Sequence, residues 1–210
     1  MRILGRPIAF TVPAVAAALL ISGVVALNDY MSAPGAVGET PDAWPSGTGI
    51  ERTPERWTIV LAAHPKCPCT RATAEQMIGP LRGSPEADLV ILSYVSPERA
   101  DSPPEPGVAG RLAELPNARV VADPGARLAE RFGAVTSGHV VAFAPDGSTA
   151  FSGGVTRSRG MSGPATGLAS LHALLSDSTP PAAEACVYGC PLVGPAEGRA
   201  SVDLSAGDQR

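Results

Sequence analysis

The feature that most constrains how this chain folds is the pair Cys67-Pro68-Cys69, which follows the apolar residues 57–63 and precedes the helix-like residues 70–81. This order places two thiols at the junction between a buried strand and the first turn of a helix. That turn carries unpaired N–H groups and a partial positive charge, and both favour thiolate over thiol. Because thiolate is both the nucleophile and the metal ligand, the position of the pair predicts a reactive site.

The two cysteines are predicted to have different roles. Cys67 lies at the mouth of the predicted helix beside the positive charge of Lys66, so we expect it to be the nucleophile. Cys69 enters the first turn and is the candidate resolving thiol, while Pro68 fits there because early helical N–H groups have no helical partner. A disulfide between residues two apart closes a small, strained ring, which predicts an exchange-prone bond. The alternative is an inert or permanently bridged pair.

Other residues near the pair and in the tail have open roles. His64 precedes Cys67 by three positions, and it either tunes that thiol or binds metal, or it ends a strand and hydrogen-bonds locally. Lys66 and His64 are therefore the candidate tuning groups. Cys186 and Cys190 are four residues apart, a spacing that allows a local disulfide to tie down the residues between them.

Charge and composition exclude some classes of function. The 210 residues are 44% hydrophobic and 17% charged, which predicts a packed core in one domain with accessory segments. The net charge is −4, and no basic stripe alternates with aromatic residues, so we expect no nucleic-acid partner.

The N-terminus predicts a membrane segment. Arg2 and Arg6 precede a stretch without charges, and its apolar residues 8–27 approach the ~20 residues that a spanning helix needs. A signal-peptide core is usually shorter, so we expect an uncleaved anchor; the alternative is a signal peptide cleaved near residues 24–26 and a secreted product. Basic residues stay cytoplasmic, which predicts a single-pass protein whose domain faces the periplasm or the cell exterior. Disulfides are permitted there.

The remaining chain alternates between strand and helix signals. The predicted parts are an anchor or signal segment at 1–27, a Pro/Gly-rich linker with little regular structure at 28–56, a domain at 57–176, and a partly ordered, cysteine-containing tail at 177–210. Strands are predicted over residues 57–63, 88–95, 119–122, 140–144 and 148–152. Helices are predicted over residues 70–81, 108–115, 126–132 and 167–176. This alternation predicts an α/β domain with a central, largely parallel but mixed sheet flanked by helices and a hairpin at one end.

Four segments carry a resemblance to known proteins: HPKCPCTRA at residues 64–72, FGAVTSG at 132–138, FSGGVT at 151–156 and YGCPL at 188–192. The order of elements over residues 57–176 resembles the thioredoxin fold. Within that superfamily, the segments are most similar to short, membrane-anchored bacterial thioredoxin-like proteins known as RedB-like. The resemblance implies thiol–disulfide exchange on protein thiols or disulfides, with no dissociable cofactor and with an unidentified redox partner that recycles the pair. It also implies Cys190 as a candidate resolving cysteine that returns to the pair.

The chain departs from thioredoxins at two positions near the pair. Thioredoxins carry Cys-x-x-Cys, whereas the first cysteine here is one residue closer to the second. Thioredoxins also place a cis-proline before the strand that faces the motif, and Gly138 occupies the corresponding position of the substrate groove.

Two other functions therefore remain open. Cys67, Cys69 and His64 would form a soft site for Cu(I) or Zn(II), which prefer thiolate and imidazole ligands. The third reading is a redox-inert, anchored interaction domain, which the missing cis-proline favours.

Overall fold

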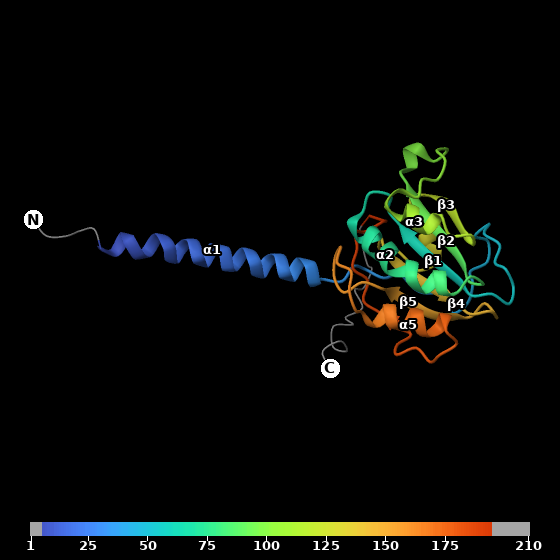
Figure 1. Ribbon diagram of the computed structural model, residues 1–210. Helices are drawn as coiled ribbons and strands as arrows, with labels where there is room; N and C mark the ends of the chain where they lie inside the picture. The colour runs from blue at the N-terminus through green and yellow to red at the C-terminus, as the bar shows by residue number, and fades with distance from the viewer. Residues whose placement is uncertain (1–5, 195–210) are drawn as a thin grey trace, which may run out of the picture. The chain divides into compact units, whose positions relative to one another are not determined.

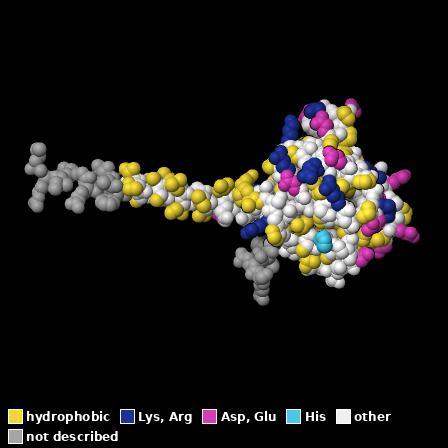
Figure 2. All heavy atoms as spheres, in the orientation of Figure 1, with side chains coloured by type: hydrophobic (Ala, Val, Ile, Leu, Met, Phe, Trp, Pro, Cys, Tyr) yellow, Lys and Arg dark blue, Asp and Glu magenta, His cyan; other side chains and the backbone are white. Residues whose placement is uncertain are grey.

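The computed structural model describes residues 6–194, and the chain divides into two compact units, residues 1–33 and 34–210 (Figure 1). The first unit is the helix α1, Arg6–Ser32, which continues past Leu27 into the predicted linker. Its residues Val12–Ser32 are long and apolar enough to cross a membrane, and their hydrophobic side chains are exposed (Figure 2). This helix could be a membrane anchor or a signal sequence. The predictions of a cytoplasmic Arg2 and of a partly ordered tail over residues 195–210 concern residues outside those that the structure describes.

The second unit is built on a six-stranded sheet. The strands are β1 (Thr58–Ala63), β2 (Asp88–Val95), β3 (Ala118–Pro124), β4 (His139–Phe143), β5 (Thr149–Gly154) and β6 (Glu184–Ala185). Their order in the sheet is β3-β2-β1-β4-β5-β6. The strands β1, β2 and β3 are parallel, β4 runs antiparallel to both β1 and β5, and β6 pairs parallel with β5. A parallel strand–helix–strand unit followed by an antiparallel hairpin is the thioredoxin-like arrangement, so the predicted fold class is confirmed.

Helices connect and cover these strands. They are α2 (Pro68–Gly83), α3 (Gly110–Ala113), α4 (Arg127–Arg131) and α5 (Thr166–Leu175), with short 3-10 helices η1 (Pro97–Arg99) and η2 (Gly107–Ala109). The five predicted strands and four predicted helices are confirmed, with shifts of a few residues at their ends. The predicted helix at 108–115 is divided between η2 and α3. The sheet also gains β6, which lies in the segment predicted as the tail.

The core consists of two layers, one on each face of the sheet. Because side chains alternate along a strand, Ile59 and Leu61 of β1 pack into one layer, and Val60 and Ala62 pack into the other. The first layer includes apolar side chains of α2, α3 and α5, and the second includes those of α4. Strands covered on both faces form continuous apolar runs, as the sequence of β1 shows.

The predicted linker has little regular structure but is packed on the domain from residue 34 onward. Trp44 meets the rings of Phe132 and Phe143 edge-on, with centroids 5.0 Å away in each case. The backbone N–H of Trp44 donates to Gly147 O at 2.9 Å, and the backbone N–H of Gly38 donates to Gly133 O at 2.8 Å. The segment therefore forms part of the second core layer instead of a free tether.

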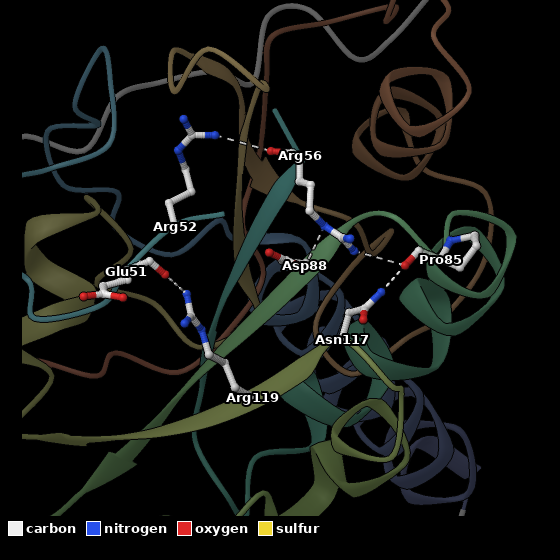
Figure 3. A network of polar contacts seen from close by, with 7 residues as sticks. All are labelled: Glu51, Arg52, Arg56, Pro85, Asp88, Asn117 and Arg119. Carbon is white, nitrogen blue, oxygen red and sulfur yellow. Dashed lines mark hydrogen bonds and ion pairs between the residues drawn. The ribbon is translucent and has the colours of Figure 1, made fainter. Parts of the chain in front are cut away.

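A polar network fixes the end of this segment to the start of the sheet (Figure 3). Arg56 Nε lies 3.1 Å from an oxygen of Asp88, the first residue of β2, and Arg56 Nη2 donates to Pro85 O at 3.2 Å. The Asn117 amide donates to the same Pro85 oxygen. These contacts hold the entrance to β1 against the loops before β2 and β3.

His139, the first residue of β4, is fully buried and neutral. Its Nε2 lies 2.8 Å from Ser152 Oγ, which in turn lies 2.9 Å from Thr40 Oγ1 of the linker. Burial lowers the pKa of His139 from 6.5 to about 4 because the charged imidazolium has lost its water.

Acid is therefore expected to destabilise the protein through His139. Between pH 6.5 and about 4 the imidazole takes up a proton in the unfolded chain but not in the folded chain. The free energy of unfolding should fall by up to about 3 kcal/mol as the pH is lowered across that window. The stabilisation that is lost is fully present above pH 6.5. Urea unfolding of the full-length protein, followed by tryptophan fluorescence at several pH values, measures this slope. His139→Asn, which cannot titrate, should make this slope shallower, and parallel curves for the two proteins would refute the assignment.

Candidate functional site

The reactive pair lies where β1 passes into α2. A tight turn follows β1, closed by the Cys67 N–H donating to His64 O at 3.0 Å. Cys67 is the N-cap residue of α2, with an extended backbone (φ −85°, ψ 126°), and Pro68 begins the helix. This geometry places the Cys67 side chain beside the first N–H groups of α2, which have no helical partners. Cys67 and Cys69 are each only 4% exposed.

Two residues from distant parts of the chain complete the site. Cys67 Sγ lies 3.2 Å from Ser137 Oγ, just before β4, and 3.7 Å from Cys190 Sγ in the tail. The Cys190 N–H donates to Ser137 Oγ at 3.0 Å, so this hydroxyl group contacts both cysteines. None of the four cysteines forms a disulfide in the structure, and Cys190 lies at the pair instead of bonding to Cys186.

Hydrogen bonds make the Cys67 thiol unusually acidic for a cysteine. Its pKa is lowered from 9.0 to about 4, chiefly by a hydrogen bond from the Cys69 thiol. Burial of the sulfur opposes this shift, whereas Ser137 Oγ and the backbone N–H groups of Thr70 and Cys69 add to it by donating to the thiolate. Cys67 is therefore ionised at neutral pH, which is the state in which sulfur attacks a disulfide.

The other two thiols remain protonated at neutral pH. The pKa of Cys69 is raised because its thiol proton is held in the hydrogen bond to Cys67, and burial and the Cys67 charge act in the same direction. The pKa of Cys190, an exposed residue whose sulfur has lost part of its water, is raised by this partial desolvation and then by the negative charge of Cys67, with the nearby charge of Arg159 opposing. The same contacts therefore lower the pKa of Cys67 and raise the pKa values of Cys69 and Cys190.

The two candidate tuning groups lie outside this cluster of hydrogen bonds. Lys66 is exposed, and the groups that lower the pKa of Cys67 are the thiol, hydroxyl and N–H donors. The His64 ring stacks on Tyr94, with centroids 5.4 Å apart, and its Nδ1 accepts from the Lys66 N–H at 3.3 Å. Among the described residues, no group of three or more His, Cys, Asp or Glu side chains is arranged to hold a metal ion.

Gly138, the predicted groove position, lies against the start of α2. Its φ of +84° is unfavourable for any residue with a Cβ and incompatible with proline. A Cβ there would approach Thr73 Oγ1 to 2.8 Å, and the Gly138 N–H donates to Ala62 O at 2.7 Å. All peptide bonds among the described residues are trans. Glycine here brings the loop before β4 close to the helix that carries Cys69.

Sequence reasoning missed Ser137 and Arg159. Ser137 directly precedes Gly138, the predicted groove position, so the sequence offered a local signal that it lies near Cys67. Arg159 donates through Nη1 to Gly189 O in the tail, and no pattern near residue 159 indicates that contact.

A cavity of about 660 Å³ lies elsewhere, between the start of α5 and the tail, and its lining includes Arg157, Cys186 and Tyr188. Cys67, Cys69 and Cys190 do not line it. We place the candidate site at the three sulfur atoms, because the groups that can perform chemistry gather there and not around that cavity.

Comparisons with known proteins support the fold and leave the activity open. No protein-family model matches the chain, and no curated protein matches it. The crystal structure of an uncharacterized conserved protein from Geobacillus kaustophilus superposes with a TM-score of 0.53 and 18% identity, covering 80% of this chain and 92% of that one. A hypothetical protein from Sinorhizobium meliloti 1021 gives a TM-score of 0.52 and 13% identity, covering 79% of this chain and 93% of the other. Identities this low show a shared fold alone.

A partial match has a described activity. It is a secreted Mycobacterium tuberculosis disulfide oxidoreductase homologous to E. coli DsbE, with a TM-score of 0.35, 15% identity, and coverage of 46% of this chain and 67% of that one. We infer no shared activity from an overlap of this extent.

Proposed function

We propose that this protein is a thiol–disulfide oxidoreductase in which Cys67 is the attacking thiolate and Cys69 the resolving thiol. The observation that carries the proposal is the hydrogen-bonded Cys67 sulfur at the start of α2, with a pKa of about 4. A structural cysteine needs no such stabilisation of its charged form. Reactive cysteines owe a lowered pKa to environments of this kind.

The exchange balances without a cofactor. The Cys67 thiolate attacks one sulfur of a client disulfide, the client S–S bond breaks, and the other client sulfur leaves as a thiolate that takes up a proton. Formation of this mixed disulfide removes the charge on Cys67 that raises the pKa of Cys69. Cys69 then loses its proton more readily and attacks Cys67 Sγ, which releases the second client thiol. The client gains two electrons, and Cys67 and Cys69 become a disulfide.

We further propose that the exchange takes place outside the cytoplasm, with α1 as the membrane anchor. The support is the length and apolar surface of Val12–Ser32 together with the basic residues that precede it in the sequence. Membership among the RedB-like proteins is part of the same proposal and depends on the sequence segments that carry that resemblance.

Redox mapping of the full-length protein in detergent micelles tests the function. The protein is equilibrated in glutathione buffers of graded potential, alkylated, and analysed by peptide mass spectrometry. A reversible Cys67–Cys69 bond supports the proposal, and Cys69→Ser should trap a mixed disulfide at Cys67. If Cys67 stays a free thiol at every potential, or is protected only when Cu(I) or Zn(II) is added, the proposal is wrong.

A further inference from the structure

The tail lies on the chain as an added strand beside Cys67. The Ser137 N–H donates to Cys190 O, and the Leu192 N–H donates to Val135 O, both at 2.9 Å. Thr136 and Pro191 form the antiparallel bridge between these two bonds. Residues 189–192 therefore bind residues 135–137 through main-chain groups, as an extended peptide would.

This pairing leaves Cys67 with limited access. Cys67 is 4% exposed, so a client disulfide cannot reach its sulfur unless a neighbouring group moves. Cys190, in contrast, is exposed and places its sulfur 3.7 Å from Cys67. The tail thus presents a cysteine to the nucleophile from the position in which a client cysteine would be attacked.

Three residues of the tail, Gly189, Cys190 and Pro191, suit the place that they take beside residues 135–137. Pro191 has no N–H, and it lies at the bridge position, where its neighbours Cys190 and Leu192 form the main-chain hydrogen bonds. A Cβ on Gly189 would come within 1.9 Å of Ser137 O, so the residue before the cysteine has no space for a side chain. The carbonyl of Gly189 accepts from Arg159 Nη1.

We infer that residues 135–137 form a docking strip for an extended, cystine-containing segment of a client polypeptide, and that residues 189–192 are its resident competitor. The inference rests on the proposed function. The strip selects clients with glycine directly before the reacting cysteine. Main-chain pairing accepts many side chains at the other positions, but the close approach to Ser137 O leaves no space for a Cβ at this one. The client cysteine takes the place of Cys190, which leaves Cys69, fixed in α2, to complete the exchange.

The test uses full-length reduced protein in detergent and two synthetic pentapeptides, Tyr-Gly-Cys-Pro-Leu and Tyr-Val-Cys-Pro-Leu, each joined through cysteine to thionitrobenzoate. Attack by Cys67 on the peptide sulfur releases coloured thionitrobenzoate and leaves the peptide on Cys67. Gly189→Ala displaces the tail by steric overlap with Ser137 O. Gly194→Ala is the matched control, since a Cβ there meets no atom within 4 Å.

We expect Gly189→Ala to raise the initial rate with the glycine peptide about tenfold, because the two main-chain hydrogen bonds that hold the tail each contribute a factor of a few. Gly194→Ala should react like the wild type, and the valine peptide should react about tenfold more slowly than the glycine peptide. Equal rates for the wild type and Gly189→Ala, or for the two peptides, would overturn the inference.

Two additions keep the outcomes distinct. Arg159→Ala loosens the tail without touching its pairing strip, so a threefold or greater acceleration is expected even if Gly189→Ala fails to fold, and an unchanged rate counts against the inference. The mixed disulfide of thionitrobenzoate with mercaptoethanol is small and does not need the strip. If it also fails to react with any form of the protein, the proposed function itself is wrong, whereas reaction with this probe and no peptide preference removes only the docking strip.

Discussion

Replacing Cys67 by serine is expected to lower thiol–disulfide exchange by the full-length protein by at least about 10³-fold, because a serine hydroxyl is not ionised at neutral pH and cannot form the mixed disulfide. Among the described residues, Cys67 is the cysteine whose pKa is lowered, whereas the pKa values of Cys69 and Cys190 are raised. Neither neighbour can therefore supply a comparable thiolate. The initial rate of insulin-disulfide reduction in the presence of dithiothreitol measures the effect.

Cys186→Ser is the matched control for this prediction. Cys186 lies on the lining of the separate cavity and not among the three sulfur atoms, so its replacement should leave the rate within about twofold of the wild type. Circular dichroism of both variants establishes that they are folded. Comparable residual activity in Cys67→Ser and Cys186→Ser would remove Cys67 from the role of nucleophile.

The reaction of Cys67 is expected to stay fast at a pH where ordinary thiols are inert. With a pKa of about 4 instead of 9.0, Cys67 remains almost fully ionised at pH 5, where an ordinary thiol would be about 10⁻⁴ ionised. The rate of its alkylation by iodoacetamide should be nearly level from about pH 8 to pH 5 and half-maximal near pH 4. Peptide mass spectrometry separates the modification of Cys67 from that of exposed Cys190.

Ser137→Ala probes the cause of this low pKa. Loss of the hydroxyl that donates to the thiolate should move the midpoint upward by about one pH unit, whereas urea-unfolded protein should titrate near 9. The sign also predicts an effect on stability: because ionisation is easier in the folded protein, the Cys67 thiolate stabilises the reduced fold. This contribution is fully present above about pH 9, shrinks steadily as the pH falls, and is lost by about pH 4. A midpoint above pH 8 in the wild type would contradict the hydrogen-bonded thiolate.

Local sequence was sufficient to predict the scaffold. The apolar run before Cys67, the helix signal after it and the alternation of later strands and helices all depend on periodicity and on turn residues within short windows. Those signals predicted the order of the elements and placed the pair at the start of α2. They could not predict β6, because this two-residue strand in a proline-rich segment is defined by its pairing with the distant strand β5 and not by a local pattern.

What the sequence by itself determined about this protein is the apolar N-terminal helix, the thioredoxin-like order of strands and helices, and the position of two cysteines at a helix start. Only the tertiary structure decided that Ser137 and Cys190 meet Cys67, that His64 turns toward Tyr94, and that the tail pairs with residues 135–137. The physical reason is the range of the interactions. Secondary structure follows from neighbouring residues, whereas the acidity and access of Cys67 depend on contacts between segments that are 70 and 123 positions apart in the chain.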